Sequence, residues 1–190
     1  YQRTSINTEV QDAVSIAAAD KMAKLYAALT EDSDKDALEI VNEEEEEEST
    51  RSASILLTRL LFLMFGDDAG LWQQDLFHRF IRERTVDDGS DLAGQLYQLF
   101  RVLNTPEHRR PRGLDPAVNA FPYVNGHIFD GNEDLGLLAF TKAMRDALLE
   151  ASAFDWKEVS PAVFGSLFQT VKSKEARRAE GEHYTTENNI

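Results

Sequence analysis

The triplet Asp155-Trp156-Lys157 combines residue types that could carry out chemistry. Nucleases that use a divalent metal gather acidic side chains and a lysine around the ion, and acid-x-lysine matches part of that pattern. The triplet lies between two expected helices, however, without a partner acid on a preceding strand. We therefore expect a structural role, with Trp156 as an aromatic anchor at a helix end.

Arg59 places a guanidinium inside the apolar stretch 55–65. An unpaired buried guanidinium would be strongly destabilising, so this charge needs a partner. Asp67 or Asp68, about two helical turns further on, is the partner that we expect. A single arginine without a base or nucleophile has no catalytic mechanism, so a structural ion pair is the favoured interpretation.

Metal and thiol chemistry find little support in the sequence. There is no cysteine, which excludes disulfides, thiolate zinc sites and cysteine nucleophiles. The histidines lack the spacing of metal ligands, so we expect no metal site. They are His78, His108, His127 and His183.

The formal net charge of −14 is unevenly distributed. Residues 31–48 contain eleven acids and one base, which gives −10 for this stretch and −4 for the rest of the chain. Consecutive glutamates repel one another and bury no apolar surface, so Glu43 to Glu48 is interpreted as a solvated loop or linker. Docking of a basic partner is the alternative.

Two segments are basic. His108-Arg109-Arg110-Pro111-Arg112 is the first, and the second contains Lys172, Lys174, Arg177 and Arg178. Either segment could contact phosphates, but neither is interleaved with aromatic residues as base-stacking surfaces are. For Arg177 and Arg178, DNA contact and a surface or interdomain salt bridge remain alternatives.

The 190 residues suffice for one domain with appendages. Because the chain begins at Tyr1 rather than Met, we expect a fragment of a longer protein. The apolar run 55–65 is far shorter than the roughly 20 residues of a membrane span. No charged and then apolar leader opens the chain, so we expect a cytoplasmic protein without a membrane partner.

Apolar residues at the three-and-four spacing of a helical face indicate several helices. We expect them over residues 7–29, 55–65, 76–81, 92–103 and 137–151, with a further one starting at Ser160-Pro161. Stretch 55–65 is apolar nearly all round and should be the central helix. Asn125-Gly126 between apolar flanks predicts a hairpin turn. The predicted fold is mostly α, an irregular helical bundle with one small β-hairpin near 121–129.

Three stretches together resemble a known family. They are Arg59-Leu60-Leu61-Phe62 with Phe65-Gly66-Asp67-Asp68, then Phe121 to Gly126, and then Asp155 to Thr185, which includes Gly181-Glu182-His183-Tyr184-Thr185. In this order they resemble the helical spacer of MmeI-like type IIL restriction-modification enzymes, where it leads into an adenine-N6 DNA methyltransferase domain. Glu182, Gly66 and the six-glutamate run depart from that family's pattern.

The resemblance implies a parent protein that transfers a methyl group from S-adenosylmethionine to adenine N6 in DNA. His183, Tyr184 and Thr185 would then line the methionine end of the cofactor, because an aromatic face and a hydroxyl suit a sulfonium with a polar tail. Without the family, Tyr184 and Thr185 would be interpreted as a packed tail with a helix cap.

The sequence lacks the Asn-Pro-Pro-aromatic and Phe-x-Gly-x-Gly elements of that catalytic domain. We therefore expect a chain that is inactive and binds no cofactor alone, with a downstream methyltransferase domain as its partner. The domains implied are a helix (1–30), an acidic linker (31–50), the helical spacer (51–172) and the start of a truncated methyltransferase (173–190). Alternatives are an acidic helical interaction module or DNA mimic, and a small complete enzyme.

Overall fold

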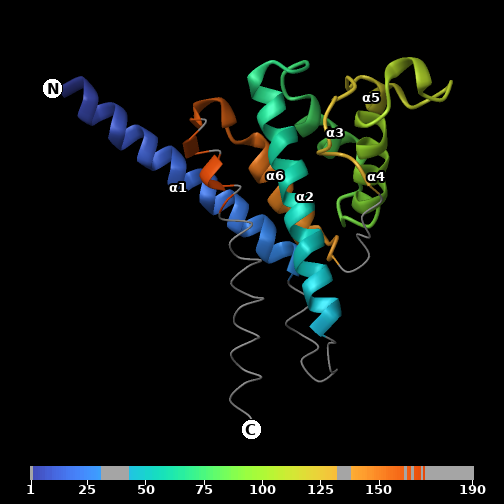
Figure 1. Ribbon diagram of the computed structural model, residues 1–190, viewed down its shortest axis with the longest axis horizontal. Coiled ribbons are helices and arrows are strands. Elements are labelled where there is room, and N and C mark those ends of the chain that lie inside the picture. Colours follow the sequence, from blue (N-terminus) through green and yellow to red (C-terminus); the bar gives the residue numbers. More distant parts are fainter. Residues whose placement is uncertain are drawn as a thin grey trace, which may run out of the picture.

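The mostly helical fold is confirmed by the computed structural model, which describes residues 2–30, 43–131, 138–160, 162, 163, 165–167 and 169. No strand occurs among them. In Figure 1, α1 and α6 lie on one side of the central helix α2, and α4 and α5 lie on the other. The elements are α1 (Gln2–Thr30), α2 (Glu43–Ala69), α3 (Leu76–Arg84), α4 (Leu92–Leu103), η2 (Glu107–Arg109), α5 (Pro116–Asn119), α6 (Lys142–Ala153) and η3 (Trp156–Glu158).

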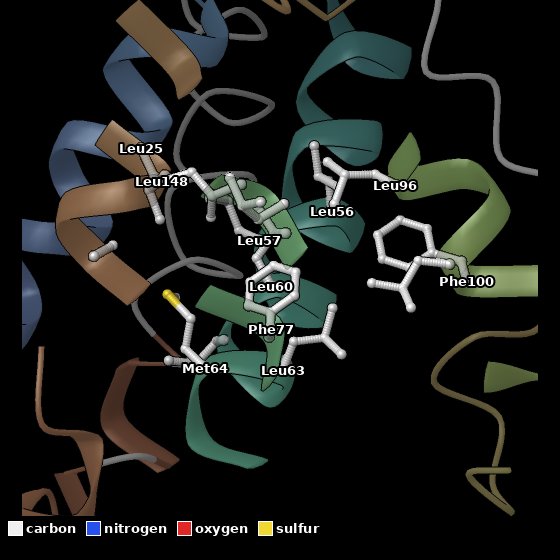
Figure 2. Close-up of a cluster of buried hydrophobic side chains, with 14 of the residues drawn as sticks. Leu25, Leu56, Leu57, Leu60, Leu63, Met64, Phe77, Leu96, Phe100 and Leu148 are labelled. Carbon is white, nitrogen blue, oxygen red and sulfur yellow. The ribbon is translucent and has the colours of Figure 1, made fainter. Parts of the chain in front are cut away.

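Helix α2 supplies the centre of the core, as its apolar sequence predicts. Its leucines are fully buried against side chains from four other helices. Each buried leucine stabilises the fold by about 1.5–3 kcal/mol relative to an exposed one. Figure 2 shows this cluster, which includes Leu56, Leu57, Leu60, Leu63 and Met64 of α2, Leu25 of α1, Phe77 of α3, Leu96 and Phe100 of α4, and Leu148 of α6.

The second half of α1 packs against α6. Met22, Leu25 and Leu29 are buried there, and the Leu29 carbonyl accepts a 3.0 Å hydrogen bond from the amide of Ala139. The first half of the helix projects beyond the body in Figure 1. Ile16 is 71% exposed, in agreement with that position. The amphipathic helix predicted over 7–29 is confirmed, and its buried face is confined to its second half.

The six glutamates form a helix, so the predicted loop is wrong over residues 43–50. Glu43 to Glu48 are the first turns of α2, and their side chains are largely exposed. Two effects outweigh their mutual repulsion. Glutamate has a good helix propensity, and acids in a first turn are stabilised by the positive end of the helix dipole. Residues 31–42 lie outside the described part, and the domain boundaries remain a prediction.

The predicted hairpin over 121–129 is wrong. A type I′ turn needs positive φ at both central residues, and Asp75 is the one non-glycine residue with positive φ in the described part, so Asn125 does not meet that need. The flanks also have other partners. The amide of Val124 donates to Leu103 at the end of α4, and the amide of Tyr123 donates to the Glu107 carboxylate.

The last two expected helices start close to where the sequence places them. Helix α6 begins after Thr141, whose hydroxyl accepts a hydrogen bond from the Met144 amide, and so starts later than the expected 137. The Ser160 hydroxyl accepts from the Val163 amide at 3.2 Å, and the described residues that follow are helical. Ser160 therefore caps this helix as predicted.

Candidate nucleic-acid interface

Arg110 is the organising residue of the basic loop, defined here as residues 107–112. Its guanidinium donates hydrogen bonds to carbonyls at the end of α4, at the end of α5 and in the segment that follows α5. The acceptors are the carbonyls of Val102 (3.1 Å), Thr105 (3.1 Å), Asn119 (3.3 Å) and Phe121 (2.8 Å), and the side chain of Asn119 (3.2 Å). Arg110 is thus committed to the fold and is not available to a ligand.

The other basic residues of the loop are turned to solvent. His108, Arg109 and Arg112 are exposed. The one acid of the loop, Glu107, accepts a 3.0 Å hydrogen bond from the Tyr123 amide, and this bond is the main reason why the pKa of Glu107 is held below its ordinary value. The outer face of the loop therefore carries positive charge, while the Glu107 carboxylate is engaged in a hydrogen bond with a backbone amide.

Arg59 is buried, but its partners differ from the predicted ones. Its Nε donates to the carbonyl of Ile128 at 2.9 Å and its Nη2 to the carbonyl of Asp130 at 2.8 Å, while the guanidinium carbon lies 5.1 Å from the centre of the Phe100 ring. The structural interpretation is confirmed. The expected aspartate partner is wrong, because Arg59 donates to carbonyls of the 128–130 segment, whereas Asp67 and Asp68 bind other groups.

Asp67 and Asp68 bind other groups. Asp67 accepts from the Trp72 indole and from the amides of Phe77 and His78 at the start of α3. Asp68 accepts from the Trp156 amide at 2.7 Å. Burial raises the pKa of both carboxyls. Both aspartates therefore connect α2 to neighbouring elements.

The acid-x-lysine triplet is a helix cap. The carboxylate of Asp155 accepts a hydrogen bond from the Lys157 amide at 3.1 Å and so caps η3. Trp156 is fully buried, and its indole donates to the carbonyl of Ala151 at 2.9 Å. The anchor role of Trp156 is confirmed. Within the described part, no three acid or histidine side chains are placed to hold a metal ion.

An open pocket lies beside Arg59. It has a volume of about 250 Å³, smaller than the ~300–1,000 Å³ typical of small-molecule sites, and is half polar. Residues of α4 and of the segment just after it contribute most of the lining. The lining residues are Arg59, Tyr97, Phe100, Arg101, Asn104, Thr105, Phe129 and Gly131.

The remaining predicted site residues lie outside the described part. These are His183, Tyr184 and Thr185, expected at the cofactor, and Arg177 and Arg178, expected at DNA. None of the described helices combines the length and the apolar character that a membrane span requires. The structure thus describes the helical body, whereas the cofactor and DNA assignments remain predictions.

Sequence reasoning missed the roles of two arginines. Nothing in the sequence distinguished Arg110 from its basic neighbours, because a run of similar residues does not indicate which side chain turns into the fold. Arg145 is buried, and its guanidinium donates to the hydroxyl of Thr85 and to the carbonyls of Arg82 and Thr85. The burial of Arg145 could have been predicted, since this residue lies next to Met144 on the apolar face of α6.

Comparisons with known proteins agree on a single family. A family model described as "MmeI, helicase spacer domain" matches residues 51–129. The solved structure of the type IIL restriction-modification enzyme MmeI in complex with DNA aligns with a TM-score of 0.65 and 40% identity over 82% of this chain. The chain belongs to the spacer region of MmeI-like enzymes.

Two curated relatives extend the match. DNA methyltransferase A of Bacillus subtilis is 31% identical over 97% of the chain. A Methanocaldococcus jannaschii protein, named as a type II restriction enzyme and methyltransferase, is 25% identical over 70% of the chain. This spacer region covers 19% and 13% of the two relatives and 19% of the MmeI chain, and so spans a fifth or less of each.

Proposed function

We propose that this chain is the helical spacer of a restriction-modification protein that methylates adenine N6 in DNA. In that role it would hold the methyltransferase in a fixed position relative to the other modules. The observation that carries the proposal is the match to DNA methyltransferase A over 97% of the chain. The described polar groups support scaffolding, because Arg59, Asp67 and Arg110 are all committed to hydrogen bonds within the fold.

The reacting groups of the parent protein belong to a domain beyond this spacer in our proposal. S-adenosylmethionine would supply the methyl group there. His183, Tyr184 and Thr185 would border its methionine end, and Arg177 and Arg178 would contact DNA phosphates. A protein of this kind would work in the cytoplasm and serve in defence against phage DNA.

The acidic interaction module is the less favoured alternative. It rested on the glutamate run as a separate docking strip, whereas Glu43 to Glu48 continue directly into the central helix. A spacer also accounts for the matches over residues 51–129 and over most of the chain. One arrangement thus explains the family and the fold together.

A methylation assay on three polypeptides tests the proposal. The first is this chain extended through the downstream domain, the second is the same protein with residues 51–160 replaced by a flexible linker of equal length, and the third is the 190-residue chain. We expect the first to transfer labelled methyl groups to adenine in duplex DNA and the other two to transfer none. Binding of S-adenosylmethionine by the linker variant would show that its methyltransferase domain is folded. Methylation by the purified 190-residue chain would contradict the proposal.

Variants of the extended protein test the individual residues. Tyr184→Ala should raise the KM for S-adenosylmethionine more than the KM for DNA. The double variant Arg177→Gln with Arg178→Gln should do the reverse, because it removes phosphate contacts that carry no cofactor. Equal effects of the two variants on both KM values would argue for a structural role of this segment.

A further inference from the structure

We infer that the outer face of the basic loop, formed by His108, Arg109 and Arg112, is a contact surface for DNA phosphates. This inference rests on the proposed function, since it presumes a parent protein that acts on DNA. It names residues other than Arg177 and Arg178, on the described body of the spacer. The loop lies beyond the end of α4, on the side of α2 away from α1 (Figure 1).

The loop is held in one shape before any ligand arrives. Arg110 ties it to the ends of α4 and α5, and the Glu107 carboxylate ties it to the Tyr123 amide. Arg110 Nε also bonds to the carbonyl of Thr105, where the loop leaves α4. Side chains on a fixed backbone lose less conformational entropy on binding than those on a mobile one. The exposed cations are therefore presented from a preorganised support.

The surrounding charges leave this face positive. Residues 101–113 contain four arginines and one glutamate, within a chain of net charge −14. The nearest following acid, Asp115, is engaged as the cap of α5 and in a 3.2 Å ion pair with Arg84. Among the described residues, neither Arg109 nor Arg112 forms an ion pair within 4 Å. These two cations are available for an external anion.

The composition of the face favours phosphates over bases. Arginine can also contact guanine, but 107–112 contains neither asparagine, glutamine, phenylalanine, tyrosine nor tryptophan, the side chains that would add adenine contacts or stacking surfaces beside the arginines. Arginine binds phosphate oxygens through two parallel donors. Pro106 and Pro111 restrict the backbone on either side of Arg109. The surface suits sequence-independent contact with a DNA backbone.

The salt dependence of DNA binding tests this inference. The probe is a labelled 30-base-pair duplex of mixed sequence, titrated with the 190-residue chain between 25 and 150 mM salt. The test variant is Arg109→Gln with Arg112→Gln. We expect the slope of log affinity against log salt to fall in magnitude by about two, because each lost phosphate contact removes about one ion. Both side chains are exposed, so circular dichroism and thermal unfolding should not change.

The matched control is Arg51→Gln with Lys157→Gln, which removes the same charge from exposed positions on α2 and η3. An unchanged slope in this control, together with the reduced slope in the test variant, supports the inference. Equal slopes in both variants would mean diffuse charge attraction and would overturn it. Absence of binding by the native chain at 25 mM salt would also overturn it. Neither result would affect the spacer role, which depends on the methylation assay.

Discussion

The indole of Trp72 donates a 2.7 Å hydrogen bond to the carboxylate of Asp67, five residues earlier on α2. The same carboxylate accepts from the amides of Phe77 and His78, so it caps α3 in place of Asp75, the residue before that helix, whose side chain forms no cap. Trp72 in turn contacts Phe62 and Phe121 edge to face. The Asp67–Trp72 pair therefore fixes the turn between α2 and α3, beside the buried core.

Gly66→Ala should destabilise the protein, although alanine favours a helix. A Cβ atom at position 66 would lie 2.3 Å from the Trp72 ring, so the indole would have to move away from Asp67. We expect a net loss of about 1–3 kcal/mol in the free energy of unfolding, more than the ~1 kcal/mol that alanine contributes over glycine in a helix. Urea denaturation measures the difference. A more stable variant would show that Trp72 moves without cost.

Asp67→Asn should destabilise the protein by an amount that depends on pH. An amide has one acceptor oxygen where the carboxylate uses two, so one amide of α3 loses its partner, at about 1–3 kcal/mol. Burial raises the pKa of Asp67 above its unfolded value, so this carboxyl contributes most to stability below the unfolded pKa and loses that contribution as pH rises through the folded pKa. The difference in the free energy of unfolding between wild type and variant should therefore be larger near pH 4 than at pH 7. Denaturation at the two pH values measures it, with Asp12→Asn, at an exposed position on α1, as control.

Arg110→Ala should cost far more stability than Arg109→Ala. Loss of the Arg110 guanidinium leaves the carbonyls of Thr105 and Phe121 without their donor, and each such loss costs about 1–3 kcal/mol. Arg109 is exposed, so its change should stay within about 0.5 kcal/mol. Arg110→Lys should rescue little, because an ammonium cannot reproduce the planar fork. Equal unfolding midpoints for the two alanine variants would contradict this role for Arg110.

Apolar periodicity made the helices predictable, because the burial of one helical face decides both sequence and structure. It could not place Glu43 to Glu48, where repulsion between like charges competes with helix propensity and the helix dipole. The Asn125-Gly126 signal failed for another reason. Its flanking residues Phe121 and Phe129 bury their rings against different aromatic partners, Trp72 and Phe100, and so do not pair as strands.

For the basic loop, the sequence predicts which residues are basic but not which of their side chains face solvent. The sequence shows the cluster of cations at 108–112, but only the fold turns Arg110 inward and leaves Arg109 outward. Arg59 shows the same limit. Its need for a partner follows from the burial of a charge, whereas the identity of its acceptors, two carbonyls 69 and 71 positions away, depends on tertiary packing. Helical spacing suggested an aspartate because spacing along one helix predicts only contacts within that helix.

Trp156→Ala should be among the most damaging single changes in this chain. The indole is fully buried, packs edge to face on Phe154, and joins η3 to α6 through the carbonyl of Ala151. Its removal should cost about 3–5 kcal/mol in the free energy of unfolding, the usual range for a large aromatic replaced by alanine in a core.

The neighbouring variant Lys157→Gln separates an anchor from a catalytic triplet. Lys157 is exposed and its amide, not its ammonium, bonds to Asp155, so we expect its stability to stay within about 0.5 kcal/mol of the native value. In the extended protein, any DNA cleavage should also be unchanged in Lys157→Gln. Loss of cleavage with stability intact would show that the triplet belongs to a nuclease site, because a helix cap has no need of the ammonium group.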